Sequence, residues 1–252
     1  MAADVPFASD PAAARRGLEG AFAGVDVVVQ PSATRRKALL VADMDSTMIT
    51  VECIDELADY AGIKAEVAAV TEAAMRGELD FEGALDARVA LLAGLREDVI
   101  AQCLAERVTI MGGAKALVRT MRANGGHAVL VSGGFTRFAE PVAAAIGFDR
   151  AIANVLLIED GRLTGKVAKP IVGSATKEET LRRAIAERSI DPALSLAVGD
   201  GANDLAMIGA AGLGVAYHAK PIVAAAAAAR VDHGDLTALL YAQGYAREDW
   251  VL

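Results

Sequence analysis

Aromatic residues are scarce in this chain, and so are cysteine and histidine. Only 4 % of its 252 residues are aromatic, and it has two cysteines and three histidines. Cys53 and Cys103 lie far apart and form no C-x-x-C pair, so we expect two buried thiols and no disulfide. His127, His218 and His233 show no spacing typical of metal ligands. A zinc or disulfide framework is therefore not expected.

The sequence also lacks an excess of positive charge and any long apolar run. Its formal net charge is −8, which argues against a nucleic-acid partner because binding to a phosphate backbone needs a basic patch. No run of about 20 apolar residues is free of charge, so we expect no membrane span. The start, Met1 to Asp4, lacks the basic-then-apolar order of a signal peptide. We therefore expect a cytoplasmic protein with no membrane partner.

What the chain does contain is a large supply of aliphatic residues in alternating strand and helix patterns. Hydrophobic residues make up 54 % of it, enough for a sizeable core. Apolar runs predict strands at 39–43, 127–132, 194–199 and 212–216, and helical spacing predicts helices at 113–124 and 135–147. A turn at Asp160-Gly161 predicts a hairpin over residues 156–164. This alternation indicates an α/β fold with a doubly wound, mostly parallel sheet.

Three parts of the chain are expected to differ in organisation. Residues 52–110 contain no convincing strand and have apolar residues at helical spacing, which predicts a helical cap inserted after the first strand. Such a cap would lie above the carboxyl ends of the strands, where it excludes water and selects substrate. Residues 37–51 and 111–252 would form the core. Residues 1–36 are expected to be an amino-terminal arm or the remnant of a domain, with one apolar run, 25–29, that could form a strand.

The most informative motif is D-M-D-S-T, which begins at Asp43 directly after the apolar run 39–42. The side chains of Asp43 and Asp45 would point to the same side, with Cα atoms roughly 7 Å apart. In open α/β sheets, ligands bind at the carboxyl ends of strands. Because two carboxylates at one site resist ionising together, one of them tends to hold a proton, and we expect this of Asp45. The alternative is that Asp45 caps a nearby helix.

Two further motifs follow predicted strands later in the chain. Ser132-Gly133-Gly134 comes after the second strand, where the sequence passes into a helix. The Ser132 hydroxyl and the Gly133 amide could both donate to a phosphate at a helix amino terminus. The sequence G-D-G-A-N-D, from Gly199 to Asp204, follows the strand at 194–199.

Lys177 stands between these two motifs. The run from Thr176 to Glu179 is typical of a capping box, with Thr176 as N-cap and Glu179 at the third helical position. A cation would then lie in the first turn of a helix, where the macrodipole opposes it by roughly 0.3–1 kcal/mol. An unfavourable local choice indicates an external partner, and we expect a bound phosphate. A solvated surface lysine is the alternative.

These four elements, in this order, resemble the haloacid dehalogenase superfamily of phosphotransferases and, within it, the phosphoserine phosphatase family. The resemblance covers roughly residues 37 to 245. It implies Mg²⁺-dependent hydrolysis of O-phospho-L-serine to L-serine and phosphate, the last step of serine biosynthesis. The reaction would pass through an aspartyl-phosphate intermediate.

The resemblance implies a role for each carboxylate. Asp43 would be the nucleophile, and Asp45 would protonate the departing seryl oxygen and then act as base for the hydrolytic water. Asp43, Asp200 and the backbone carbonyl of Asp45 would hold Mg²⁺, which prefers hard oxygen ligands. Asp204 would orient Lys177 or a metal-bound water.

Recognition of the amino acid would involve the cap. Glu52 occupies the place of a family glutamate that meets the substrate amine, and Arg88 that of an arginine that meets the substrate carboxylate. The two could instead form a solvated face or an ion pair within the cap. Asn203 would contact substrate or phosphate. Met75 and Phe81 would form an apolar lid, or pack in the core.

Several alternatives stay open at this point. A phosphotransferase of the same fold, passing the phosphoryl group to an amino-acid hydroxyl such as that of homoserine, would carry the same motifs. A phosphatase for another small phosphomonoester and a non-catalytic phosphoserine sensor are further alternatives. The sequence is compatible with a monomer or a homodimer.

Overall fold

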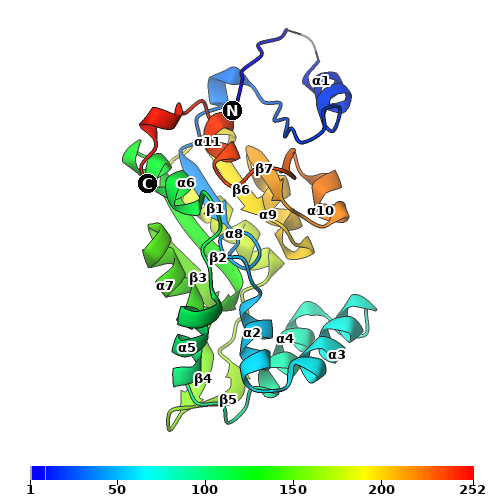
Figure 1. Cartoon of the computed structure of the whole chain (residues 1–252), viewed down its shortest axis with the longest axis vertical. Coiled ribbons are helices and arrows are strands. Elements are labelled where there is room, and N and C mark those ends of the chain that lie inside the picture. Colours follow the sequence, from blue (N-terminus) through cyan, green and yellow to red (C-terminus); the bar gives the residue numbers. More distant parts are fainter. Residues whose placement is uncertain (1, 9) are drawn as a thin grey trace.

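The computed structural model describes residues 2–8 and 10–252, apart from the side chain of Met75, and its centre is a six-stranded parallel sheet (Figure 1). The strand order is β3-β2-β1-β6-β7-β8. The strands are β1 (Leu39–Ala42), β2 (His127–Phe135), β3 (Arg150–Asn154), β6 (Ser195–Gly199), β7 (Leu213–Tyr217) and β8 (Ala229–Val231). This sheet confirms the α/β prediction.

Helices cover both faces of the sheet because successive side chains of a buried strand point in opposite directions. Leu40 and Ala42 of β1 pack in one cluster, with residues of α6 (Ala114–Ala123), α7 (Thr136–Ile146) and α11 (Ala238–Ala242). Leu39 and Val41 pack in another, with residues of α8 (Ser174–Glu187) and α9 (Leu205–Ala210). A short helix, α10 (Pro221–Ala226), contacts β7. The sheet is therefore doubly wound, as predicted.

The strand order reverses between β1 and β6. From β1 the chain runs outward through β2 and β3, and from β6 it runs outward in the other direction through β7 and β8. In such sheets a crevice opens outside the carboxyl ends of the strands at the point of reversal. Asp43 directly follows β1 and Asp200 directly follows β6, so both lie at this crevice.

A group of helices lies beyond the carboxyl ends of the central strands (Figure 1). It comprises α2 (Cys53–Tyr60), α3 (Lys64–Met75), α4 (Phe81–Ala90) and α5 (Asp98–Arg107). The predicted hairpin is formed by β4 (Leu156–Glu159) and β5 (Arg162–Val167), and β5 packs against α4. The amide of Leu163 donates to the Leu95 carbonyl at 2.8 Å. The hairpin thus contacts the helical segment, although it lies within the part of the sequence assigned to the core.

The amino-terminal arm lies at the other end of the molecule from α3 and α4 (Figure 1). It contains α1 (Pro11–Leu18) and a 3₁₀ turn, η1 (Ser32–Thr34). Residues 25–29 have no assigned secondary structure and join neither sheet, so the run that could have formed a strand does not do so. The Asp26 carboxylate instead accepts hydrogen bonds from the amides of Asp232 and Gly234, both at 2.7 Å.

The remaining short elements are three 3₁₀ turns, η2 (Pro192–Leu194), η3 (Ala202–Asp204) and η4 (Arg247–Asp249). Cys53 and Cys103 are free, buried thiols, as expected. Among the described helices, none combines the length and the apolar character needed to cross a membrane.

Candidate active site

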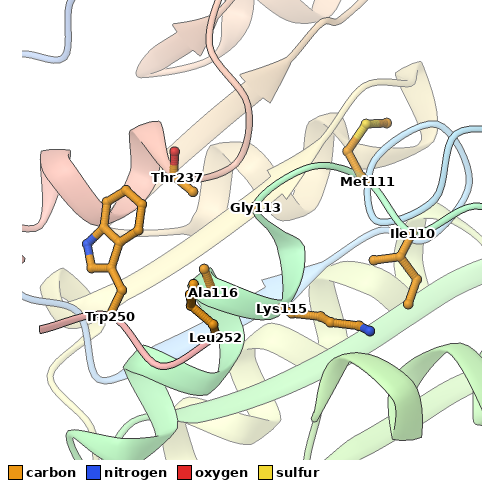
Figure 2. A pocket seen from close by; sticks show the side chains of 8 residues that line it. All are labelled: Ile110, Met111, Gly113, Lys115, Ala116, Thr237, Trp250 and Leu252. Carbon is orange, nitrogen blue, oxygen red and sulfur yellow. The ribbon is translucent and has the colours of Figure 1, made fainter. Parts of the chain in front are cut away.

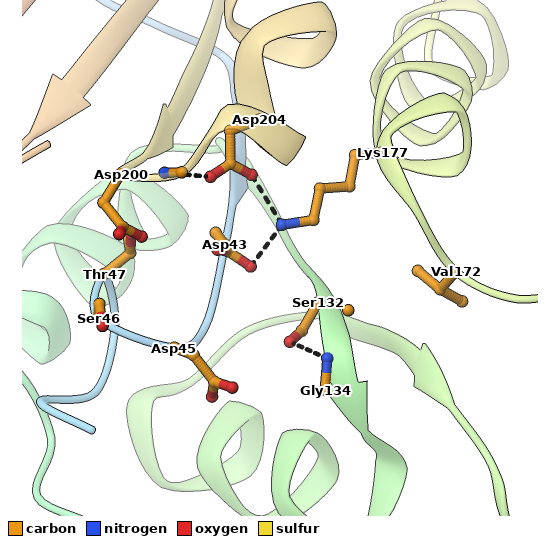
Figure 3. A network of polar contacts seen from close by, with 12 residues as sticks. Asp43, Asp45, Ser46, Thr47, Ser132, Gly134, Val172, Lys177, Asp200 and Asp204 are labelled. Carbon is orange, nitrogen blue, oxygen red and sulfur yellow. Dashed lines mark hydrogen bonds and ion pairs between the residues drawn. The ribbon is translucent and has the colours of Figure 1, made fainter. Parts of the chain in front are cut away.

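Side chains from separate stretches of the sequence meet at the carboxyl ends of β1, β2 and β6 (Figure 3). Asp43 comes from β1, Ser132 from β2, and Asp200 and Asp204 from the segment after β6. Lys177 is the fourth residue of α8. One carboxylate oxygen from each of Asp43, Asp200 and Asp204 can be chosen so that all three lie within 4.8 Å of one another.

Lys177 lies between two of these carboxylates. Its ammonium is 2.6 Å from Oδ1 of Asp43 and 2.7 Å from Oδ1 of Asp204, and its side chain is 1 % exposed. Burial alone would lower the pKa of Lys177, but the two carboxylates outweigh this effect and hold that pKa above its ordinary value. Burial raises the pKa of Asp43, and the Lys177 ammonium opposes that rise. The lysine therefore stays charged between two buried carboxyl groups.

The capping-box prediction around Lys177 is wrong in its register. Helix α8 begins at Ser174 with Gly173 as N-cap, so Thr176 is the third helical residue. The Thr176 hydroxyl lies 3.5 Å from the Gly173 amide. Lys177 is still in the first turn of the helix, where the macrodipole disfavours a positive charge. The buried carboxyl groups of Asp43 and Asp204 offset this unfavourable position. The alternative of a solvated surface lysine is wrong because the Lys177 side chain is buried.

Asp45 has one anchored and one unpaired oxygen. Oδ2 accepts a hydrogen bond at 3.3 Å from the amide of Cys53, the first residue of α2. Oδ1 is buried and has no hydrogen-bond partner among the described residues. Burial, followed by the negative charge of Glu52, raises the pKa of Asp45 to about 7. Asp45 therefore does contact a helix start, but its second oxygen is available to a ligand.

The Ser132-Gly133-Gly134 motif contacts Asp45 from the neighbouring strand. Oγ of Ser132 accepts a hydrogen bond from the Gly134 amide at 2.8 Å. A Cβ at Gly134 would lie 3.4 Å from Oδ2 of Asp45, so backbone and carboxylate are in close contact. The sequence predicted that the motif lies where the strand passes into a helix. Strand β2 instead extends to Phe135, so the motif lies in the last part of the strand and before the start of α7.

Asp200 is held by Thr47, which follows the first motif. The Thr47 hydroxyl donates to Oδ1 of Asp200 at 3.2 Å. Burial, followed by the charges of Asp204 and Glu52, raises the pKa of Asp200 to about 6. A Cβ at Gly199 would overlap the carboxylate of Asp204. The glycine before Asp200 is thus required by the close approach of Asp204 to the backbone.

The oxygens of the site fit a divalent cation. Both oxygens of Asp204 are used, Oδ1 by Lys177 and Oδ2 by the Gly201 amide at 3.1 Å. Asp43 and Asp200 use Oδ1 in the contacts described above, which leaves Oδ2 of each for a ligand. Carboxylate oxygens are ligands that hard divalent cations prefer. Asp43 and Asp200 could therefore hold a metal while Asp204 orients Lys177.

Glu52 faces the site from the start of the helical segment. Ser46, whose φ of 58° is in the left-handed region, donates to Oε1 of Glu52 at 2.8 Å. The negative charge of Glu52 contributes to the raised pKa values of Asp45 and Asp200. The carboxylate of Glu52 is thus close to the other acidic groups.

Arg88 is half-buried on α4, and its Nε donates to the Ala84 carbonyl at 3.2 Å. Burial lowers the pKa of Arg88, and the negative charges of Asp55 and Glu52 oppose this effect. Arg88 and Glu52 are therefore near each other, and they make no salt bridge in the described part of the chain. Asn203 follows β6, and a Cβ on Gly201 would overlap its Oδ1.

Phe81 connects the helical segment to the core. A Cβ at Gly133 would lie 3.2 Å from the Phe81 ring, and so would a Cβ at Gly173. The ring therefore lies against both the end of β2 and the loop before α8, and a role as an apolar lid stays a prediction. The side chain of Met75, expected to share this lid, lies outside the described residues.

Comparison with known proteins agrees with this geometry. The family model of the haloacid dehalogenase-like hydrolases matches residues 40–209. The chain belongs to this family. It is 46 % identical over 243 residues to the phosphoserine phosphatase of Streptomyces coelicolor, an alignment that covers 96 % of this chain and 59 % of the relative. It is 48 % identical over 207 residues to the phosphoserine phosphatase of Albidiferax ferrireducens, covering 80 % of this chain and 87 % of that protein.

Solved haloacid dehalogenase-like structures share the fold. A probable phosphoserine phosphatase from Vibrio cholerae, in its unliganded form, has a TM-score of 0.79 at 40 % identity and covers 87 % of this chain and 68 % of that chain. A substrate-bound phosphoserine phosphatase complex has a TM-score of 0.76 at 36 % identity, and the match covers 82 % of this chain and 98 % of that chain. The chain spans 59 % of the Streptomyces coelicolor relative and 64 % of the Haemophilus influenzae phosphoserine phosphatase.

Three polar residues of this haloacid dehalogenase-like site were not singled out by the sequence patterns. Ser46 and Thr47 belong to the first motif, and their adjacency to Asp45 is a signal that could have drawn attention to them. Asn154, at the end of β3, bonds to the backbone of Gly133. It belongs to none of the motifs, so no local signal marked it.

A separate cavity of about 420 Å³ near the start of α6 does not belong to the hydrolase site (Figure 2). Its lining includes the apolar side chains of Ile110, Ala116 and Trp250, together with Lys115 and Thr237. No aspartate or glutamate is among the lining residues. It therefore lacks a cluster of carboxylates like that of Asp43, Asp200 and Asp204.

Proposed function

We propose that this chain hydrolyses O-phospho-L-serine to L-serine and phosphate through an aspartyl-phosphate on Asp43, with Mg²⁺ as cofactor. The observation that carries the proposal is the position of Asp43 beside Lys177, with the unpaired Oδ1 of Asp45 in the same crevice. The relatives named phosphoserine phosphatase support the choice of substrate.

In the first step, an oxygen of Asp43 bonds to phosphorus while the bond from phosphorus to the seryl oxygen breaks. Asp43 is a competent nucleophile when ionised, and the Lys177 ammonium 2.6 Å away opposes the rise that burial causes in its pKa. The departing seryl oxygen needs a proton, and Asp45 supplies it. The raised pKa of Asp45, about 7, is suited to this exchange near neutral pH.

In the second step, Asp45 accepts a proton from water as the water oxygen bonds to phosphorus and the bond to Asp43 breaks. The carboxylate of Asp43 is regenerated and phosphate is released. Lys177, the Ser132 hydroxyl and the Gly133 amide would face the phosphate oxygens, where positive charge and donors stabilise the transferring group. Asn203 would contact the substrate or the phosphate.

Asp43 and Asp200, with the backbone carbonyl of Asp45, would hold Mg²⁺. When bound, the cation neutralises phosphate charge that the net charge of −8 would otherwise repel. Glu52 would bind the substrate amine and Arg88 the substrate carboxylate. Within the described residues, Glu52 and Arg88 make no salt bridge with each other, so both groups would be available to a zwitterionic substrate.

The chemistry up to the aspartyl-phosphate is shared with a phosphotransferase that uses an amino-acid hydroxyl such as that of homoserine as acceptor. We favour the hydrolase because the relatives above are named phosphatases. A cytoplasmic location and a monomeric or homodimeric state remain predictions of the sequence.

The test is phosphate release from O-phospho-L-serine with no added acceptor, measured with Mg²⁺ and with EDTA. We expect release that depends on Mg²⁺ and is abolished in Asp43→Asn. Asp191→Asn, an exposed N-cap of η2, is the matched control and should retain activity. Release that requires homoserine would point to the phosphotransferase, and activity in Asp43→Asn would reject the nucleophile.

A further inference from the structure

We propose that Asn154 is a positioning residue that holds together two segments facing the phosphate, the end of β2 and the loop before α8, an inference that rests on the proposed function. Asn154 ends β3 and is 2 % exposed. Its Nδ2 donates to the Gly133 carbonyl at 2.9 Å and to the Val172 carbonyl at 3.3 Å. Its Oδ1 accepts from the Val172 amide at 2.8 Å. One buried carboxamide thus bridges two segments that are distant in sequence.

The first segment needs such a bridge because β2 leaves its regular register there. Val131 pairs with Ile152, and the next paired residues are Phe135 and Asn154. Three residues of β2, 132–134, therefore stand opposite one residue of β3. Bulges of this kind disrupt the ladder and re-aim the residues they contain. The bond from Asn154 to Gly133 fixes the bulge that presents Ser132 and the Gly133 amide.

The second segment leads directly to Lys177. Val172 precedes Gly173, the N-cap of α8, and the Gly173 carbonyl accepts from the Lys177 amide at 3.1 Å. The Thr176 hydroxyl donates to the Ile171 carbonyl at 3.4 Å. The loop and the first turn of α8 are therefore tied together. By holding Val172, Asn154 sets the position of Lys177 relative to the bulge.

The distance between the two segments that Asn154 joins is short enough for one aromatic ring, that of Phe81, to contact both of them. A Cβ at Gly133 would lie 3.8 Å from the Val172 carbonyl, so the two segments approach closely. Phe81 contacts both Gly133 and Gly173. If the segments separated, the donors at Gly133 and the ammonium of Lys177 would no longer converge on one phosphate.

The experiment compares Asn154→Ala and Asn154→Ser with Gln243→Ala. Gln243 is a matched control because it is also a buried carboxamide, 1 % exposed. It accepts from the Lys37 amide at 3.1 Å and donates to the Leu239 carbonyl at 3.0 Å. Lys37 precedes β1, so these contacts lie at the amino end of the sheet, away from the site. Three quantities are measured for each variant. Calorimetry in the presence of Mg²⁺ gives the Kd of inorganic phosphate, enzyme kinetics give the inhibition constant of L-serine, and thermal unfolding gives the Tm.

We expect both Asn154 variants to raise the Kd of phosphate by about tenfold or more, since small misplacements at such sites cost up to about 100-fold. The inhibition constant of L-serine should change less than twofold, because Glu52 and Arg88 are not held by Asn154. Gln243→Ala should lower the Tm without changing the phosphate Kd.

An unchanged phosphate Kd in both Asn154 variants would overturn the proposal. So would an equal loss in Gln243→Ala, an equal loss of L-serine affinity, or failure of both Asn154 variants to fold, since each indicates a purely structural residue. If the wild-type chain releases no phosphate from O-phospho-L-serine, the proposed function fails. The phosphate Kd values of the variants and their control still decide the role of Asn154 in that case.

Discussion

Replacing Lys177 with methionine removes a buried cation and leaves its two carboxylate partners in place. Methionine is close to lysine in length, so the change mainly deletes charge. Asp43 is 5 % exposed and Asp204 is fully buried, and both lie within 2.7 Å of the lysine nitrogen. Breaking a buried ion pair by removing one partner costs about 3–5 kcal/mol. That is a large share of the roughly 5–15 kcal/mol by which a domain is stable.

The assay is thermal unfolding followed by circular dichroism, in EDTA so that no divalent cation replaces the missing charge. For a chain of this length, each kcal/mol lost from the free energy of unfolding lowers the Tm by about 2–4 °C, so we expect Lys177→Met to lower the Tm by about 6–20 °C. Lys169→Met is the control. Its ammonium lies 2.7 Å from Asp86, but both side chains are about half exposed, at 51 % and 49 %. Such a surface pair contributes about 0–1 kcal/mol.

Adding Asp204→Asn to Lys177→Met tests the cause of the loss. If uncompensated negative charge destabilises the single variant, the double variant should recover about 1 kcal/mol or more, within the range of coupling between contacting residues. A Tm for Lys177→Met equal to that of Lys169→Met would refute the reasoning. A double variant less stable than Lys177→Met would show that packing, and not charge, explains the loss.

Three further predictions concern the substrate side of the site. Arg88→Ala should lower kcat/KM for O-phospho-L-serine far more than for p-nitrophenyl phosphate, and equal losses in the two assays would exclude Arg88 from substrate recognition. Ser46→Ala removes the hydrogen bond to Glu52, so KM for O-phospho-L-serine should rise roughly 2- to 12-fold; an unchanged KM would contradict this. Gly133→Ala places a Cβ 3.2 Å from the Phe81 ring, so activity should fall and partly return when Phe81→Leu is added; a double variant as impaired as the single one would speak against this contact.

Much of the sheet could be predicted because a strand covered on both faces must be apolar throughout. The run at 39–42 shows this, and the predicted strand ends one residue later than β1 does. The run at 25–29 is mostly apolar but contains Asp26, and it forms no strand, since a strand also needs a neighbour with which to pair. The end of β2 was placed too early because Gly133 and Gly134 lie in a bulge that continues to Phe135.

Within the site, the sequence by itself was sufficient for groups whose relation is local. Asp43 and Asp45 follow one strand, so the geometry of a strand end determines that both approach the same crevice. The membership of Asp200 and Lys177 in the same site was instead implied by the resemblance of the ordered motifs to the haloacid dehalogenase superfamily. Only the inference about Asp43 and Asp45 rests on backbone periodicity and the rule that ligands bind where parallel strands end.

Tertiary structure decided the rest. Only the packing of α8 against the segment after β6 shows that Lys177 is buried between Asp43 and Asp204. Only the juxtaposition of β3 with the loop before α8 shows that Asn154 bridges Gly133 and Val172. The physical reason is that burial, pKa shifts and long-range hydrogen bonds depend on which surfaces meet in space. Residues distant in sequence acquire these properties when the chain packs, and no local pattern records them.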